Sequence, residues 1–244
     1  IIYVYIYNNI HSSYMFKRIL KWIAKIILIF FGITIGLVLI YKFINPPITP
    51  FMIVKYFEGE ASVIQKDWVS IEEISSEIPL AVIAAEDQKF MNHNGFDMEA
   101  IEKAIENNSK GKRLKGGSTI SQQTAKNVFL VPNRSWVRKG LETYFTFLIE
   151  LFWSKGRIME VYLNVIEQGD GIYGVQASSI IHFNKDAKKV NRSQAALMAV
   201  VLPNPLKYKI KNPSGYIRGR QSWTIRQMGN LGGTSIVKPM YESE

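Results

Sequence analysis

The longest apolar segment of the chain lies near its start, from Ile26 to Tyr41, and contains no charged residue. With the four residues before it, this segment reaches about 30 Å as an α-helix, which is the thickness of one bilayer core. The run is longer than the apolar part of a cleavable signal peptide, and no small-residue cleavage site follows it. The pattern therefore predicts one transmembrane helix over residues 22–43.

The charges around this segment predict its orientation. Four Lys and Arg residues lie between positions 17 and 25, whereas Lys42 alone follows closely and the first acidic residue is Glu58. Because positive charge stays on the cytoplasmic side, residues 1–21 are expected inside and everything after residue 45 on the outer, periplasmic face of the inner membrane. Residues 1–14 do not fit this pattern and Met15 would be a natural start, so we expect the first fourteen to be an artefact without function.

Beyond the anchor, residues 44–57 are predicted to be a proline-rich linker and residues 58–244 to be one domain. Phe51–Ser70 contains short aromatic and β-branched runs, which predict a small strand pair or irregular packing. Helical spacing of apolar positions then dominates, without repeats or β–α alternation, so the domain should be mainly α. The predicted helices are Ile78–Ala85, Asp97–Asn107, Thr119–Phe129, Trp136–Trp153, Lys155–Val165 and Ser193–Leu202.

The composition excludes several classes of site. The 244 residues include no Cys, which rules out disulfides, thiolate zinc sites and a Cys nucleophile, and the three His are scattered. The formal net charge is +10, and five of the cations flank the anchor. For a domain outside the cytoplasm, the remaining surplus suits anionic lipid or a phosphorylated substrate better than nucleic acid.

Glu86 and Asp87 stand at the end of an apolar helical run. Burial and the negative end of the helix dipole both disfavour a charged carboxylate there, so we predict a raised pKa for Glu86. Such a group can act as a general base near neutral pH. The alternative is that one of the two carboxylates pairs with Lys89 or caps a turn.

A second polar cluster follows two glycines at positions 116 and 117. Thr119 and Gln122 have the spacing of a capping box, and a helix start is a favourable seat for an anion. Thr119, Gln122 or Gln123, and Lys126 share one helix face, which suits phosphate and sugar hydroxyls. A polar surface helix with a good cap is the alternative.

Three cations, Arg134, Arg138 and Lys139, come within six residues, and Glu142 lies one turn beyond Arg138. They could form an anion site, or Arg138 and Glu142 could form an ordinary surface pair. Gly169–Gly174 spells G-x-G-x-x-G, but a helical segment precedes it and no acidic residue follows at the required distance. We therefore predict a loop there instead of a nucleotide site.

Four motifs now stand in order: EDxxFxxHxG at Glu86–Gly95, GGSTIxQQxxKN at Gly116–Asn127, RKxxE at Arg138–Glu142 and KxxIxExYLN at Lys155–Asn164. They closely resemble the motifs of the peptidoglycan glycosyltransferases of glycosyltransferase family 51, over roughly residues 50–232. Class A penicillin-binding proteins share this domain with monofunctional, membrane-anchored enzymes. The resemblance implies a lysozyme-like head-and-jaw fold and polymerisation of lipid II into β-1,4-linked glycan, with inversion and loss of undecaprenyl pyrophosphate.

The resemblance also assigns roles to residues. Glu86 matches the general base that deprotonates the acceptor 4-hydroxyl, and Glu142 matches the second glutamate, which assists at the donor pyrophosphate directly or through a divalent ion, magnesium or manganese. The residues that match the substrate-binding positions are Ser118, Gln122, Gln123, Lys126, Asn127, Arg134, Arg138 and Lys139. No cofactor is obligatory and no protein metal site is predicted. The expected partners are lipid II, the growing lipid-linked glycan, the bilayer and other wall-synthesis or division proteins, but no nucleic acid.

The chain departs from the family pattern at two places. Ile181–Lys185 reads IHFNK where HYFGK is usual, and Gln168 stands where Trp is common, so fine substrate contacts there can differ. No KTG motif accompanies the chance S-x-x-K matches, which predicts a monofunctional enzyme without a transpeptidase. Two other functions stay open: a lysozyme-like enzyme that cleaves glycan with Glu86 as general acid, and an inactive membrane scaffold of wall synthesis.

Overall fold

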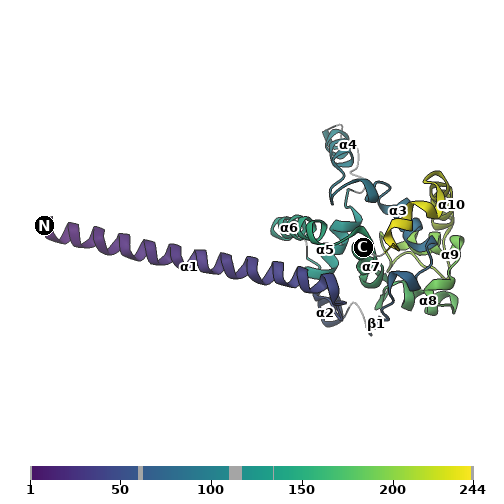
Figure 1. Ribbon diagram of the computed structural model, residues 1–244, viewed down its shortest axis with the longest axis horizontal. Coiled ribbons are helices and arrows are strands. Elements are labelled where there is room, and N and C mark those ends of the chain that lie inside the picture. The colour runs from purple at the N-terminus through teal and green to yellow at the C-terminus, as the bar shows by residue number, and fades with distance from the viewer. Residues whose placement is uncertain (1, 60–62, 110–116, 134, 243–244) are drawn as a thin grey trace. The chain divides into compact units, whose positions relative to one another are not determined.

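A computed structural model describes residues 2–59, 63–109, 117–133 and 135–242. The chain forms two compact units, Ile1–Ile44 and Asn45–Glu244. The first is one helix, α1 (Ile2–Phe43), and the second contains all other elements (Figure 1).

The second unit is mainly helical, as the sequence predicts. Its α-helices are α2 (Pro50–Phe57), α3 (Glu77–Glu86), α4 (Met98–Ser109), α5 (Ile120–Phe129), α6 (Trp136–Phe152), α7 (Lys155–Val165), α8 (Val175–Phe183), α9 (Arg192–Val201) and α10 (Gly215–Asn230). Its 3₁₀ helices are η1 (Ile71–Glu73), η2 (Phe90–Asn92), η3 (Ala187–Lys189) and η4 (Gly233–Met240). Its strands are β1 (Gln65–Lys66), β2 (Glu167–Gly169) and β3 (Ile172–Tyr173).

All six helices predicted from apolar spacing are confirmed, as α3 to α7 and α9, and their ends agree to within two residues. Helices α8 and α10, as well as α2, were not predicted. The first turn of α8 follows directly on glycines that we interpreted as a joint. The sequence of α10 is polar on most sides and contains internal glycines, which lower helix propensity and hide the pattern.

Helix α2 corrects the prediction for the segment after the anchor. Residues 50–57, which we assigned to the linker and to strands or irregular packing, form a helix that packs against α5. Thr49 caps it, since the Thr49 side chain accepts a hydrogen bond from the backbone N–H of Met52 at 3.3 Å. Pro50 occupies the first turn, where a missing N–H costs nothing because that group has no partner within the helix.

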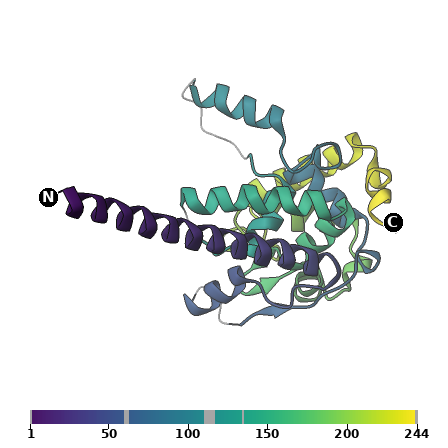
Figure 2. The same cartoon turned by 60° about the vertical axis from the view of Figure 1, so that its left-hand side comes forward.

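Helix α3 lies at the centre of the domain. Its residues from Ile78 to Ala84 are all buried, as expected for a helix that is apolar on every side. It packs against α9 and α10, while α5 packs against α6 and α7 (Figure 1). Figure 2 shows that α4, in contrast, projects away from this packed body. The end of α3, where Glu86 lies, is therefore held firmly in place.

A small three-stranded sheet lies in the order β1-β3-β2. Strand β1 runs parallel to β3, and β2 runs antiparallel to it. The segment Gly169–Gly174, which we predicted to be a loop, therefore forms most of a hairpin and the N-cap of α8. Gly174 has φ 84°, and a Cβ there would lie 2.8 Å from the carbonyl oxygen of Asn164, so only glycine fits.

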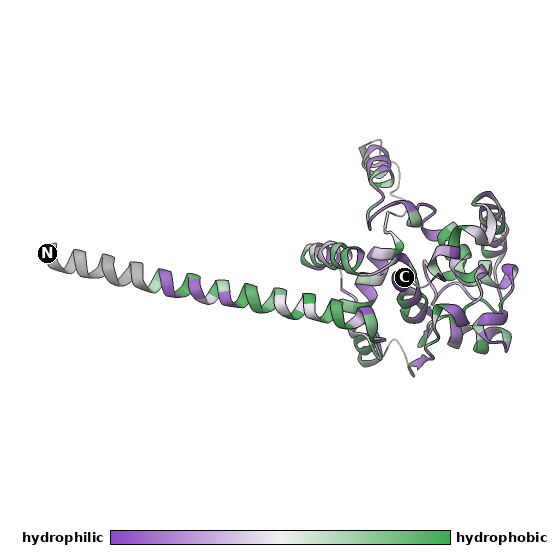
Figure 3. Cartoon of the chain, in the orientation of Figure 1, coloured by the Kyte–Doolittle hydropathy of each residue, from purple (hydrophilic) through white to green (hydrophobic). Residues whose placement is uncertain are grey.

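Within α1, the stretch Met15–Phe43 is long and apolar enough to cross a membrane. Figure 3 shows hydrophobic residues following one another along its second half. The apolar run agrees with the predicted anchor in length and composition, although the helix itself begins well before residue 22.

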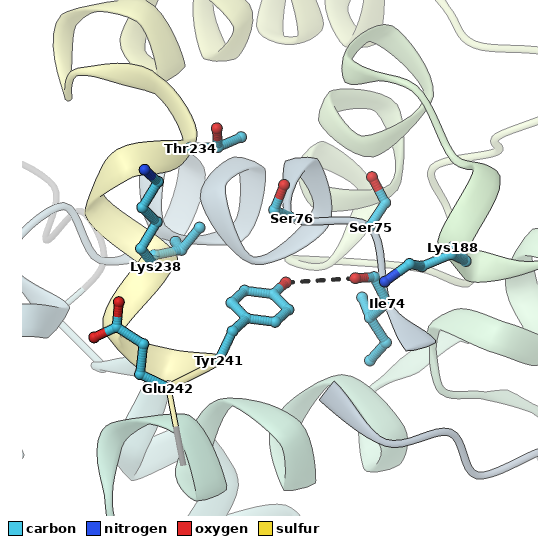
Figure 4. Close-up of a pocket in the computed structure, with 9 residues that line it drawn as sticks. Ile74, Ser75, Ser76, Lys188, Thr234, Lys238, Tyr241 and Glu242 are labelled. Atoms are coloured by element: carbon cyan, nitrogen blue, oxygen red, sulfur yellow. Dashed lines mark hydrogen bonds between the residues drawn. The ribbon is translucent and has the colours of Figure 1, made fainter. Parts of the chain in front are cut away.

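The C-terminal segment packs against the rest of the domain near the start of α3. Helix η4 packs against α3 and α7, and the Tyr241 hydroxyl donates to the Ile74 carbonyl at 3.5 Å (Figure 4). Both residues of this contact line a cavity of about 500 Å³, together with Ser75, Ser76 and Thr234. None of the residues predicted for the substrate site lines this cavity.

Candidate active site

Glu86 is the last residue of α3, and its carboxylate lies beside α5. Gln123 donates from Nε2 to Glu86 Oε2 at 3.0 Å. Desolvation is the largest influence and raises the pKa of Glu86, whereas the Gln123 hydrogen bond and the charges of Arg220 and Lys126 oppose it. The predicted direction is therefore confirmed, and the carboxylate has increased affinity for a proton.

Gln123 is itself held from the other side. The Tyr162 hydroxyl of α7 donates to Gln123 Oε1 at 3.2 Å, so the amide group must turn its NH₂ toward Glu86. Tyr162 is fully buried, and burial followed by the charges of Glu86 and Asp87 raises its pKa, so it stays a neutral donor. The two hydrogen bonds, from Tyr162 to Gln123 and from Gln123 to Glu86, fix the orientation of the Glu86 carboxylate.

Asp87 is buried and links the end of α3 to the start of α5. Its carboxylate oxygens accept from His93 Nε2 at 3.0 Å and from the backbone N–H of Ile120 at 3.0 Å. The backbone N–H of Gly95 donates to His93 Nδ1 at 3.1 Å, which leaves the imidazole proton on Nε2, facing Asp87. Asp87 therefore acts as a structural link next to the general base candidate.

Replacing Asp87 with Asn should destabilise the domain by about 2 kcal/mol, because an NH₂ group must then face one of two buried donors. Urea unfolding of the full chain in detergent micelles measures this, with Asp67→Asn as the control, since Asp67 is exposed. An unchanged unfolding midpoint for Asp87→Asn would show that the carboxylate does not join the two helices.

Gly95 in the same loop has no room for a side chain. Its φ is +86°, and an added Cβ would lie 2.8 Å from Thr146 Cγ2 of α6. The Thr146 hydroxyl in turn donates to the carbonyl of Glu142 at 2.7 Å, one helical turn earlier. The loop from the first motif thus rests directly on the part of α6 that carries the second glutamate.

The lysine of the fourth motif supports this loop. Lys155 donates to Glu150 Oε1 at 2.8 Å and to the carbonyl of His93 at 2.6 Å, and it lies over the ring of Phe90. Ser121 also donates to Glu150. Lys155 therefore positions the first two motifs relative to each other.

The predicted capping box at the start of α5 is confirmed. The backbone N–H of Thr119 donates to Gln122 Oε1 at 3.0 Å, and that of Gln122 donates to Thr119 Oγ1 at 3.2 Å. Thr119 also donates to the carbonyl of Gly95 at 2.7 Å. We predicted that Gln122 binds substrate. Its amide oxygen instead accepts the hydrogen bond of the helix cap.

Ser118 lies just before this cap and is exposed. It lines a cleft of about 220 Å³ together with Glu86, Asp87, Lys89 and Thr119. The first two motifs therefore share one open space, with the general base candidate on its wall.

Glu142 on α6 is buried and is surrounded by cations. Arg138 donates from Nη1 to Glu142 Oε2 at 2.7 Å, and Lys139 donates to Glu142 Oε1. Arg138 and Glu142 do pair, but Glu142 is buried and Lys139 joins them, so this is not the ordinary surface pair that we considered as the alternative. The carboxylate holds two cationic heads side by side, as an anion site requires.

Lys126 interacts through its charge with both Glu86 and the Glu142 cluster. It is partly buried over the ring of Phe51, 5.8 Å from the centroid, and its ammonium makes no hydrogen bond or ion pair with the residues that the structure describes. Burial lowers its pKa; the charge of Glu142 opposes this, and Arg138 adds to it. Because Lys126 also acts on the pKa of Glu86, both glutamates belong to one electrostatic site.

The described residues contain no group of three or more His, Asp or Glu that could hold a metal ion. Glu142 also fits a direct metal ligand poorly, because Arg138 and Lys139 already occupy both of its oxygens. The described carboxylates of this site therefore do not fit a metal ion bound directly to the protein.

Comparison with known proteins decides the family. The family model described as Transglycosylase matches residues 54–229. The chain belongs to the Transglycosylase family. It is 56% identical over 205 residues to the biosynthetic peptidoglycan transglycosylase of Bdellovibrio bacteriovorus, with 82% of each chain covered. It is 48% identical over 224 residues to the Shewanella oneidensis protein of the same name, covering 91% of this chain and 96% of that one.

A third relative with this name, from Bacteroides thetaiotaomicron, is 50% identical over 222 residues, covering 89% of this chain and 90% of that one. Membership in the Transglycosylase family confirms the predicted lysozyme-like glycosyltransferase fold. The match begins at residue 54, inside α2 and inside the segment that we predicted to be linker.

The structure gathers most of the predicted site residues of this Transglycosylase domain into two groups. Glu86 contacts Gln123 and lines one cleft with Ser118, while Glu142 contacts Arg138 and Lys139. The charge of Lys126 acts on Glu86, and the charge of Glu142 acts on Lys126, which links the two groups. Gln122 and Asn127 are buried in α5, and Arg134 lies outside the described residues.

Two residues near Glu86 were not predicted for the site. Tyr162 stands inside the fourth motif, so that motif was a signal that could have identified it. Arg220 lowers the pKa of Glu86 from α10, and its polar surroundings in the sequence contain no pattern that points to it.

Proposed function

We propose that this chain is a peptidoglycan glycosyltransferase that polymerises lipid II into β-1,4-linked glycan strands by inverting displacement of undecaprenyl pyrophosphate. The observation that carries this proposal is one electrostatic site, in which the charge of Lys126 acts on the desolvated carboxylate of Glu86 and the ammonium of Lys126 makes no hydrogen bond or ion pair among the described residues. The names of the relatives, biosynthetic peptidoglycan transglycosylases, support the same class of substrate.

On the acceptor side, Glu86 takes the proton of the sugar 4-hydroxyl. Gln123 binds Glu86 Oε2, which leaves Oε1 to receive this proton. The acceptor oxygen then forms a bond to the anomeric carbon of the donor as the bond from that carbon to the diphosphate breaks. One direct displacement inverts the anomeric centre, so no covalent enzyme intermediate is needed.

On the donor side, the departing diphosphate gains negative charge. Lys126, Arg138 and Lys139 supply three cations for it, and Glu142 holds two of them in place. Preorganised cations stabilise such developing charge, so a good leaving group needs no general acid. A divalent cation would act on the diphosphate itself, and its requirement is measured by adding magnesium or manganese to enzyme treated with a chelator.

Purified full chain mixed with lipid II tests the proposal, since we expect long glycan to accumulate. Digestion of finished sacculi without polymerisation would instead identify a glycan-cleaving enzyme. Neither activity, from a correctly folded chain, would favour the scaffold function. The cation cluster argues against cleavage, because glycan hydrolysis releases no diphosphate.

We propose that α1 anchors the chain in the cytoplasmic membrane, with residues 1–21 inside and the catalytic domain outside. Its apolar length and the flanking cations support this orientation. Because the chain has no Cys, Lys17→Cys and Lys207→Cys each introduce one labelling site. An impermeant maleimide applied to spheroplasts should label Lys207→Cys alone, and labelling of Lys17→Cys alone would reverse the orientation.

A further inference from the structure

Helix α2 brings an aromatic ring to the ammonium of Lys126. The Nζ atom of Lys126 lies over the ring of Phe51, 5.8 Å from its centroid. Helix α2 packs against α5, which carries Lys126 (Figure 1). Phe51 belongs to none of the four motifs and lies in the segment that we predicted to be linker. The active site therefore has a contact from a part of the chain that the motifs do not identify.

The ammonium of Lys126 is a charge without a polar partner among the described residues. Burial is the largest influence on its pKa and lowers it, which disfavours the charged form. The charge of Glu142 opposes this effect, but both oxygens of Glu142 already accept from Arg138 and Lys139. A buried charge without a hydrogen bond is costly, so another contact must help to stabilise it.

An aromatic ring can supply that contact without occupying the ammonium. The face of the ring attracts a cation within about 6 Å, and the attraction is strongest where water is excluded. The side chain of Phe51 has no charge and no hydrogen-bonding group, so the three N–H groups of Lys126 stay available for a ligand. A carboxylate in the place of the ring would bind the ammonium and compete with a diphosphate.

The fold holds the Phe51 ring in place independently of Lys126. Met52, the next residue, is fully buried, and Thr49 caps the start of α2. Just before the cap, the Lys66 ammonium donates to the carbonyl of Pro46 at 2.7 Å. The start of α2 is thus attached to the domain on both sides of the cap, and the ring is preorganised to receive the cation.

We propose that Phe51 is a positioning residue of the active site, whose ring face holds the Lys126 ammonium where it meets the diphosphate of the donor. This assignment rests on the proposed function for the identity of that anion. Lys55 of α2 also lies over the ring, 5.8 Å from its centroid. The tests must therefore separate the effect of the ring on Lys126 from its effect on Lys55.

Turnover provides the first test. Phe51→Leu should lower kcat/KM for lipid II about tenfold, because Leu keeps an apolar side chain but has no ring face to attract the cation. Phe51→Tyr keeps the ring and should retain near-normal turnover. Phe57→Leu is the matched control, since Phe57 belongs to the same helix and is 80% exposed. Normal turnover by Phe51→Leu would overturn the proposal.

A double-mutant cycle distinguishes contact with Lys126 from simple packing of α2. In a chain that already carries Lys126→Met, Phe51→Leu should cause no further loss of kcat/KM. In a chain that carries Lys55→Met, it should still cause its full tenfold loss. An undiminished loss in the Lys126→Met chain, or coupling to Lys55 in place of Lys126, would overturn the proposal.

The charge of Lys126 can also be followed without turnover. Competitive labelling of the full chain in micelles with acetic anhydride, read by mass spectrometry of the peptide that contains Lys126, measures its pKa. Phe51→Leu should lower this pKa further, because the charged form loses its contact with the ring, whereas Phe51→Tyr should leave it unchanged. An unchanged or higher pKa in Phe51→Leu would overturn the proposal.

The labelling experiment also separates this proposal from the proposed function. If the unaltered chain did not polymerise lipid II, the proposed function would fail, while labelling would still decide whether the ring stabilises the ammonium of Lys126. If the chain polymerised lipid II but Phe51→Leu changed neither turnover nor the pKa of Lys126, only the role of Phe51 would fail.

Discussion

Glu86→Gln is expected to abolish polymerisation while leaving the domain at least as stable as the original at neutral pH. The amide cannot accept the proton of the acceptor hydroxyl, and a general base contributes about 10²–10⁴-fold to the rate. The hydrogen bond from Gln123 can persist, because the amide oxygen at position 86 can still accept it. Radiolabelled lipid II turnover and thermal unfolding measure the two effects.

The direction of the stability effect follows from the pKa of Glu86. Desolvation raises this pKa in the folded state, so folding favours the protonated carboxyl. Its stability contribution is therefore greatest below the unfolded pKa and is lost as pH rises through the folded value. At neutral pH the ionised group destabilises the domain, and replacing it with a neutral amide removes that cost.

The same shift predicts the pH profile. Activity should fall on the acid side at a pH above the ordinary glutamate value of 4.5, because Glu86 must be ionised to accept a proton. Glu73→Gln is the matched control, since Glu73 is exposed and Gln can keep the hydrogen bond that it accepts from Ser70. Near-normal turnover by Glu86→Gln would remove Glu86 from the role of base.

Lys126→Met should reduce kcat/KM for lipid II by about 10²–10³-fold, the effect of removing one preorganised donor from a developing anion. Met has a similar length and no charge, so the packing over Phe51 is largely kept. Burial lowers the pKa of Lys126, which means that its charged form destabilises the fold at neutral pH. The variant should therefore melt at the same temperature as the original or higher.

Inorganic pyrophosphate distinguishes a loss of anion binding by the Lys126→Met variant from a loss of packing. It should raise the melting temperature of the original chain and of Lys207→Met, an exposed control, but have little effect on Lys126→Met. A large loss of melting temperature with normal turnover would show instead that Lys126 has a structural role.

Much of this site could be predicted because its pieces are local in the sequence. The apolar run of α3 predicts both a buried helix and the raised pKa at its end. The capping box of Thr119 with Gln122 and the pair of Arg138 with Glu142 each depend on a spacing of three or four residues. Such contacts are set by helix geometry alone.

Contacts between distant segments could not be predicted in this way. No spacing shows that Asp87 caps a helix beginning at Ile120, or that Tyr162 reaches Gln123. Gln168 and His182 were visible as departures from a family pattern, but only the fold shows that they line one cavity. Helix α10 was missed because tertiary packing against α3 and α9 outweighs its weak local propensity.

The bare backbone at Gly95 has a consequence for the reaction as a whole. A methyl group there would lie 2.8 Å from Thr146 Cγ2, so the loop or the side chains of α6 would have to shift, one turn from Glu142. The glycine therefore lets the loop that follows the proton acceptor pack closely against the helix whose glutamate holds the cations for the diphosphate.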